Sequence, residues 1–199
     1  MAYDVITISR EFGSGGRTIG KEVAKKLGIP CYDQEIIEKL AEESGFSKDY
    51  IEDKGEYANH KHWFANAFAS GGTHYSESNQ DYLWVLQRKI IRDLAAEGPC
   101  VIVGRCADYI LEKDYNCLKV FIHASIEKRI EHILENYGER RQSPEKRLRD
   151  KDEKRKAYYK YYTETEWGVA KNYHVSLDAG ALGIEHCVDI ISGIYNLEK

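Results

Sequence analysis

The sequence predicts an α/β protein in which a parallel β-sheet lies between two layers of helices. Two observations lead to this prediction. Short apolar runs alternate along the chain with segments of helical periodicity, and a glycine-rich turn separates the first strand from the first helix. The chain has 199 residues, a length that suits a single domain, residues 1–199, with a small insertion. In such sheets ligands bind at the carboxyl ends of the strands.

The first predicted unit is a strand, a glycine-rich turn and a helix. Residues 5–8 are a β-branched apolar run typical of a buried parallel strand. Residues 19–27 carry apolar side chains at helical spacing, and Gly28 follows where a left-handed cap is expected. The glycines of the turn allow a ligand to approach the backbone closely. Free N–H groups at the positive end of a helix predict an anion site; an ordinary strand-to-helix turn is the alternative.

This turn differs from the usual phosphate-binding loop, Gly-x-x-x-x-Gly-Lys-Ser/Thr, because the lysine is missing. Two registers are possible. In one, Arg17 takes the place of the lysine, Gly16 and Thr18 fall correctly, and Glu11 replaces the first glycine. In the other, aligned from the strand, Gly16 takes the place of the lysine. Arginine can hold a phosphate through two parallel N–H bonds, although it is not equivalent to lysine.

The remaining elements continue the alternation. Further strands are expected at residues 30–33, 100–104, 118–122 and 173–177, and further helices at residues 34–44, 82–96, 126–136 and 184–195. Residues 46–80 are less regular and rich in Tyr, His, Asn, Gly and Ser, which indicates an inserted region with some helix, expected to bind the acceptor. Residues 139–157 are strongly charged and predicted to be helical.

Two groups of charged residues outside the loop are candidates for ligand binding. Arg105 directly follows a strand, so it is expected either at the ligand crevice or paired with a carboxylate such as Asp108. Within the charged stretch, Asp152 and Arg155 are three residues apart and share a helix face. This stretch is either a solvated helix or a basic lid that closes over phosphates. The tyrosine-rich run after it, residues 158–162, is interpreted as packing the lid helix onto the body.

Composition narrows the class of protein. The net charge of −4 gives no basic field that would favour nucleic acid as the main partner. No apolar run approaches membrane-spanning length and no signal-peptide pattern begins the chain, so a cytoplasmic location is expected and a membrane partner is not. The five cysteines are scattered without Cys-x-x-Cys pairs, which argues against a disulfide framework or a zinc site.

Several segments together carry a family resemblance. Residues 6–8 with the glycine loop, 27–33, 101–105, 120–125, 150–155 and 177–185 resemble, in the same order, segments of the cytidylate kinase-like branch of the P-loop nucleoside monophosphate kinases. The resemblance covers nearly the whole chain. The last two segments are the most specific, because they resemble the acid-rich, arginine-ending lid and the turn that closes the core of cytidylate kinases.

The resemblance implies transfer of the ATP γ-phosphoryl group to a nucleoside monophosphate, CMP or dCMP first, with Mg²⁺. It implies the following roles: Gly13, Ser14, Gly15, Gly16, Arg17 and Thr18 hold the ATP phosphates; Thr18 contacts Mg²⁺; Asp33 and Arg105 bind the acceptor; Asp152 binds its ribose; and Arg155 holds the phosphates during transfer. Arg17, Arg155, Asp152 and the lid residue Arg141 are the candidate catalytic residues.

The chain departs from the family pattern in the acceptor site as well as in the loop. Cys106 stands where cytidylate kinases place a carboxylate that helps to read cytosine, and Gln34 where they place a serine near the base. Both departures favour considering a second hypothesis, a kinase for another small metabolite. The missing loop lysine motivates a third hypothesis, a nucleotide-binding module without turnover. A fourth, nucleic-acid binding through the Arg/Lys/Tyr-rich region, conflicts with the acidic balance of the chain.

Overall fold

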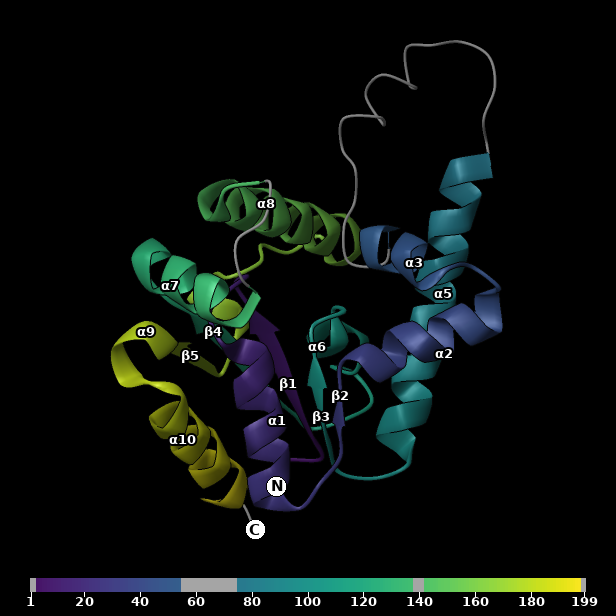
Figure 1. Cartoon of the computed structure of the whole chain (residues 1–199). Helices are drawn as coiled ribbons and strands as arrows, with labels where there is room; N and C mark the ends of the chain where they lie inside the picture. The colour runs from purple at the N-terminus through teal and green to yellow at the C-terminus, as the bar shows by residue number, and fades with distance from the viewer. Residues whose placement is uncertain (1–2, 55–74, 138–141, 198–199) are drawn as a thin grey trace.

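The centre of the molecule is a five-stranded sheet in which every pairing is parallel. The computed structural model describes residues 3–54, 75–137 and 142–197 (Figure 1). The strand order is β2-β3-β1-β4-β5. The strands are β1 (Val5–Arg10), β2 (Cys31–Tyr32), β3 (Cys100–Val103), β4 (Cys117–His123) and β5 (Val175–Asp178). The sequence-based prediction of a parallel α/β sheet is confirmed.

Helices flank the sheet on both faces. They are α1 (Gly16–Leu27), α2 (Gln34–Ser44), α3 (Lys48–Lys54), α5 (Tyr75–Ala96), α6 (Ala107–Ile110), α7 (Ile126–Tyr137), α8 (Pro144–Thr163), the 3₁₀ turn η1 (Ala170–Asn172), α9 (Ala179–Leu182) and α10 (Ile184–Leu197). One core contains residues of α1 and α10, which pack on each other. A second core contains residues of α2, α3 and α5. The helices therefore form the two outer layers of a three-layer arrangement.

The alternation of side chains along β1 separates the two cores. Ile6 and Ile8 point into the core with α1 and α10, whereas Val5 points into the core with α2 and α5. All three side chains are at most 1% exposed. A strand apolar on both faces is the pattern of a central parallel strand, because helices cover it on both sides.

Some boundaries differ from those expected. The charged stretch and the tyrosine-rich run form one continuous helix, α8, which begins after Ser143, whose side chain accepts a hydrogen bond from the N–H of Lys146. Helix α5 already begins at Tyr75, so the end of the expected insert is part of that helix. Strand β5 begins at Val175 rather than at the expected residue 173, because the turn η1 and Tyr173 precede it. Within the expected insert, residues 55–74 lie outside the described residues, as do residues 138–141 at the start of the expected lid.

The carboxyl ends of the strands meet at one edge of the sheet. In Figure 1 this is the upper edge, and α7 and α8 lie above it. The edge brings together Arg10 at the end of β1, Asp33 after β2 and Gly104 after β3. These positions lie far apart in the sequence, and the parallel order of the strands places them beside one another.

Candidate active site

The glycine-rich loop joins β1 to α1 in a fixed conformation. Gly13 has a φ of 81° and Gly15, directly before α1, a φ of 82°. These left-handed values favour glycine at both positions. The hydroxyl of Ser14 donates hydrogen bonds to the carbonyl oxygens of Glu11, at 2.9 Å, and Ile122, at 3.2 Å. The loop is thereby tied to β4, and the N-terminus of α1 opens onto the carboxyl edge of the sheet.

Arg17 contacts the side chain that was expected to line the acceptor site. Its Nε lies 2.5 Å from Oδ2 of Asp33, and its Nη2 donates to Oδ1 at 3.4 Å. The Asp33 side chain is 6% exposed and that of Arg17 is 39% exposed. Arg17 therefore bridges the first turn of α1 to the end of β2 and covers a buried carboxylate.

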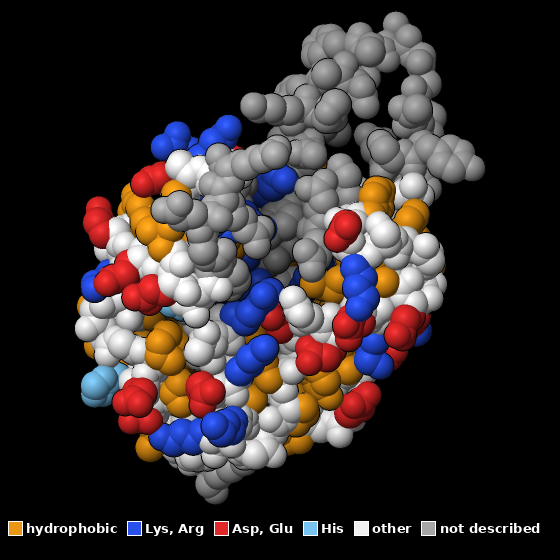
Figure 2. Space-filling view, viewed as in Figure 1, with side chains coloured by type: hydrophobic (Ala, Val, Ile, Leu, Met, Phe, Trp, Pro, Cys, Tyr) orange, Lys and Arg blue, Asp and Glu red, His pale blue; other side chains and the backbone are white. Residues whose placement is uncertain are grey.

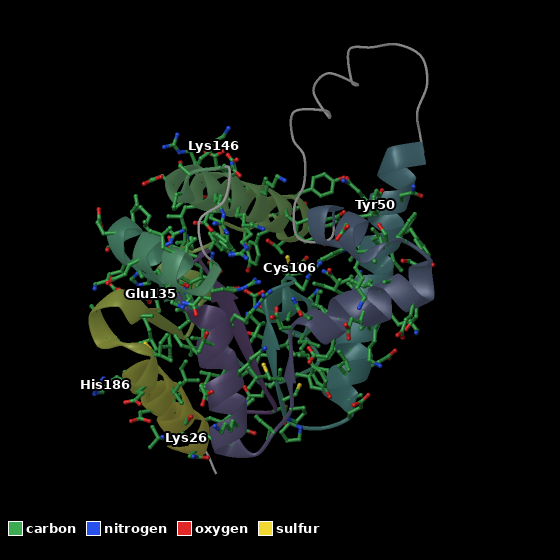
Figure 3. All side chains as sticks on the ribbon, viewed as in Figure 1. Lys26, Tyr50, Cys106, Glu135, Lys146 and His186 are labelled. Atoms are coloured by element: carbon green, nitrogen blue, oxygen red, sulfur yellow. The ribbon has the colours of Figure 1, made fainter. Side chains whose placement is uncertain are left out.

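A pocket lies at the carboxyl edge, between β1, β3 and α8. It is lined by Ser9, Arg10, Gly104, Arg105, Cys106, Arg155, Tyr158, Tyr159 and Trp167. Three of these residues are arginines that are each at most 7% exposed, and no lining residue is a carboxylate. Figure 3 shows Cys106 near the middle of the molecule, whereas Lys146 lies on the outer side of α8. Figure 2 shows Lys and Arg side chains within the hollow at the centre of the same face.

The backbone that presents Arg105 to this pocket is in a rare conformation. Gly104, Arg105 and Cys106 have φ values of 76°, 60° and 55°. Consecutive left-handed residues that are not glycine cost free energy, and such strain concentrates at functional sites. The buried amide of Gln87 on α5 supports the turn by donating to the carbonyl oxygen of Arg105 at 3.0 Å and to the hydroxyl of Tyr158 at 3.3 Å.

The guanidinium of Arg105 is incompletely satisfied. Its Nη1 is buried and has no hydrogen-bond partner among the residues that the structure describes. The alternative pairing with Asp108 is not seen: the described partner of Asp108 is the Tyr159 hydroxyl, which donates to Oδ2 at 2.9 Å. Burial raises the pKa of the Asp108 carboxyl above its ordinary value. Arg105 thus offers a buried cation to the pocket, and an anionic ligand would satisfy it.

Asp152 on α8 is the centre of a charged network that joins the expected lid to the loop. It accepts a hydrogen bond from the backbone N–H of Phe12 at 2.8 Å and forms an ion pair with Nη2 of Arg129. Arg129 also donates from Nε to the carbonyl oxygen of Phe12 at 2.8 Å, and its Nη1 lies 3.2 Å from Glu11. Nη1 of Arg155 lies 3.8 Å from Asp152. The shared helix face of Asp152 and Arg155 is confirmed, and it packs onto the loop.

The aromatic ring of Phe12 lies among cations of α8. The side chains of Arg147, Lys151 and Arg155 lie 5.9, 5.1 and 5.8 Å from its centroid. Such contacts are individually weak, and together they help to hold α8 over the loop. Tyr158 is also buried, as expected for residues that pack this helix onto the body.

Sequence reasoning placed Arg10 and Glu11 at the ligand crevice without assigning them a role, and it did not identify Gln87 or Arg129 as site residues. A signal was present for Arg129, which lies one helical turn before the buried Ile133 and so occupies the core-facing stripe of α7. A cation in such a stripe needs a partner. No comparable local signal marked Gln87, whose neighbours in α5 fit an ordinary amphipathic helix.

The other expected site residues have the following positions. Thr18 is exposed on the first turn of α1. Arg141 lies outside the described residues. Across residues 3–54, 75–137 and 142–197, no group of three or more His, Cys, Asp and Glu side chains could hold a metal ion. The helices in these ranges include none that is long and apolar enough to span a membrane.

The sheet order, the glycine-rich loop and the arginine-lined pocket define a P-loop type of kinase, a phosphotransferase that acts on a nucleotide or a small metabolite. The chain belongs to the cytidylate kinase-like family, whose profile matches residues 5–181. It is 27% identical over 201 residues to a cytidylate kinase from Archaeoglobus fulgidus, and the match covers 98% of this chain and 96% of that protein.

Solved structures share the fold. An uncharacterized protein from Eubacterium ventriosum superposes with a TM-score of 0.72 at 24% identity, over 96% of this chain and 98% of that one. A shikimate kinase from Acinetobacter baumannii, solved with shikimate, has a TM-score of 0.57 at 12% identity, over 99% and 95% of the two chains. At these identities the likeness concerns the fold.

Proposed function

We propose that this protein transfers the γ-phosphoryl group of ATP to a nucleoside monophosphate, with CMP or dCMP as the first candidates. One observation carries the proposal: three buried arginines line a pocket between β1, β3 and α8, and no lining residue is a carboxylate. Arg105 in particular has a buried Nη1 without a hydrogen-bond partner among the described residues, and an anion in the pocket would satisfy it. Phosphoryl transfer needs cations around the oxygens of the transferred group, and that is the environment this pocket offers.

The donor half of the proposed site is the loop with the first turn of α1. The N–H groups of residues 13–18 and the positive end of α1 would hold the ATP phosphates. Mg²⁺ would be held largely by the phosphates and by water, and it would neutralise charge on them. The exposed position of Thr18 fits the proposal that its hydroxyl supplies one oxygen ligand.

The acceptor half would be formed by residues around the same pocket. Arg105 would bind the acceptor phosphate with the buried Nη1 that has no described partner. Arg155 would hold the transferring phosphate, Asp152 would reach the ribose, and Asp33 would line the acceptor site. Arg141 is proposed to act from the lid. No covalent intermediate is needed, because positioning and charge stabilisation carry this reaction.

Base recognition is the least constrained part of the proposal. Cys106 lines the pocket at the position where cytidylate kinases, by resemblance, carry a carboxylate. A thiol is a weak hydrogen-bond donor and acceptor, so it would read a cytosine poorly. This observation favours a second candidate, a kinase of the same fold whose acceptor is another small metabolite.

An acceptor screen tests the proposal. ADP release from ATP and Mg²⁺ would be followed with ribo- and deoxyribonucleoside monophosphates and, in parallel, with sugar acids and polyols. The proposal expects CMP or dCMP to give the largest kcat/KM. Turnover only with a metabolite that is not a nucleotide would support the second candidate. ATP binding without turnover on any acceptor would support a nucleotide-binding module instead.

A pair of arginine variants assigns the activity to the pocket. We expect Arg105→Met to lower kcat/KM by about 100-fold, as removal of a charge-stabilising donor does. The same variant should keep or gain thermal stability, because it removes a buried cation that is incompletely paired. Arg92→Met is the control, since Arg92 is 43% exposed and pairs with Asp114 on the surface. Equal activity of the two variants would contradict the assignment.

A further inference from the structure

Position 16 of the loop cannot carry a side chain in this backbone. A Cβ on Gly16 would lie 2.5 Å from Cβ and 3.0 Å from Cγ of Arg10, and 3.3 Å from Cβ of Ile122. The first distance is much shorter than a van der Waals contact between two carbon atoms, and the obstructing atoms belong to the stem of the Arg10 side chain. The φ of Gly16 is not in the left-handed region, so space rather than backbone conformation excludes a side chain there.

This exclusion explains how the chain departs from the usual loop pattern. In Gly-x-x-x-x-Gly-Lys-Ser/Thr the first glycine and the lysine are separated by five residues. With Gly15 as the second glycine, the first falls on Arg10 and the lysine on Gly16. The chain therefore has a cation where the pattern has a glycine, and a glycine where the pattern has a cation. The space beside Gly16 has room for the stem of only one side chain, and in this protein the side chain of Arg10, at the end of β1, occupies it.

Arg10 lies in the arginine-lined pocket beside the glycine-rich loop. It ends β1, its side chain lines the pocket, and the residue is 6% exposed. Its carbonyl oxygen accepts a hydrogen bond from Nη1 of Arg155 at 3.0 Å, so the two arginines lie side by side. Arg17, the other candidate for the role of the lysine, forms an ion pair with Asp33 at 2.5 Å.

We propose that Arg10 is the loop cation of this enzyme, contacting the donor phosphates from the end of β1 in place of a lysine at position 16. The inference rests on the proposed function, since it assigns a role within that site. An arginine in this role stays charged at any accessible pH and can bind two phosphate oxygens at once.

A cycle of loop variants tests the exchange of positions. The variants are Arg10→Gly, Gly16→Lys and the double variant Arg10→Gly/Gly16→Lys, and ATP affinity is measured by calorimetry. We expect Arg10→Gly to weaken ATP binding by about 10- to 100-fold, as loss of a charge-assisted contact does. The double variant should regain most of this affinity, because it has the usual glycine and lysine positions. Lys25→Gln is the control, since Lys25 is exposed on the same helix.

The steric part is tested without any nucleotide. Gly16→Ala should lower the melting temperature in the wild-type background and have little effect in the Arg10→Gly background, where the obstructing stem is gone. This arm also covers the case in which Gly16→Lys alone fails to fold. Equal destabilisation by Gly16→Ala in both backgrounds would overturn the exchange of positions.

The outcomes separate the inference from the proposed function. Wild-type ATP affinity in Arg10→Gly, or its loss in Arg17→Ala alone, would overturn the role of Arg10 and leave the kinase function standing. Loss of ATP affinity in Arg10→Gly that is regained in the double variant would support the inference. This holds even if no acceptor is turned over, although that second result would contradict the kinase function. A wild-type protein that binds no nucleoside triphosphate would overturn both.

Discussion

The carboxylate of Asp152 on α8 accepts a hydrogen bond from the backbone N–H of Phe12, 140 residues away in the glycine-rich loop, at 2.8 Å. Arg129 of α7 binds both partners, since it pairs with Asp152 and donates to the carbonyl oxygen of Phe12. These hydrogen bonds and the ion pair therefore connect α8 directly to the loop. We expect the proposed binding of phosphates at the loop to be coupled to the position of α8 through this contact.

Removing the charge of Asp152 should lower the stability of the folded protein. In Asp152→Asn the Phe12 N–H keeps an acceptor, but the buried Arg129 loses one of its two described carboxylate partners and keeps Glu11, and Arg155 loses the carboxylate 3.8 Å from its Nη1. Breaking a buried pair in this way lowers the free energy of unfolding by about 3–5 kcal/mol. Urea denaturation measures the loss. Glu153→Gln, an exposed neighbour on the same helix, should change stability by less than about 0.5 kcal/mol. A similar, small effect of both variants would contradict a central role for Asp152.

The contact between Arg17 and Asp33 predicts energetic coupling between the donor loop and the end of β2. We expect a double-mutant cycle with Arg17→Ala, Asp33→Asn and the double variant to give an interaction free energy of about 0.5–2 kcal/mol. We expect a value in the lower half of this range, because Arg17 is 39% exposed and water screens its interaction with Asp33. Strict additivity of the two single changes would show that the Arg17–Asp33 contact contributes no interaction free energy to stability.

Gly13 in the loop before α1 and Gly28 directly after α1 make a matched test of the loop. Gly13 and Gly28 have φ values of 81° and 69°, so alanine strains the backbone at both. A Cβ at Gly13 would also lie 2.9 Å from the carbonyl oxygen of Arg129, whereas nothing lies within 4 Å at Gly28. Gly28→Ala should cost about 1 kcal/mol of unfolding free energy, and Gly13→Ala more, with weaker ATP binding in addition. Equal costs and unchanged ATP affinity would argue against a tightly packed loop.

The buried Asp108 predicts a pH dependence of stability. Burial raises the pKa of its carboxyl above the ordinary value of 3.8. Its contribution to stability is therefore complete below the unfolded-state pKa and is lost as pH rises through the folded-state pKa. The amide in Asp108→Asn does not titrate and can still accept from Tyr159. The variant should gain stability relative to wild type as pH rises from about 4 toward 8. Denaturation midpoints across this range measure the difference, and a constant difference would contradict the prediction.

The fold was predictable because its signals are local. The β-branched run at residues 5–8, the periodicity of α1 and the capping Gly28 lie within a few residues of one another. Periodicity did not show that the charged and tyrosine-rich stretches form one helix, because α8 buries charged as well as apolar side chains. A pattern of apolar spacing is weak in such a helix.

The site was only partly predictable from the sequence. Arg105 was found because residues at the ends of parallel strands converge on one edge. The partners of Arg17 and Asp152 depend on packing between distant segments, and nothing adjacent in the chain specifies them. The obstruction of position 16 by Arg10 likewise exists only once β1 and α1 are packed together.

The most direct test of the proposed reaction is to incubate the protein with ATP labelled in the γ-phosphate, Mg²⁺ and CMP or dCMP, and to separate the nucleotide products. Phosphoryl transfer at the arginine-lined pocket predicts label in CDP or dCDP with wild-type protein and about 100-fold less with Arg105→Met. No labelled diphosphate with any nucleoside monophosphate, or undiminished transfer by Arg105→Met, would contradict it.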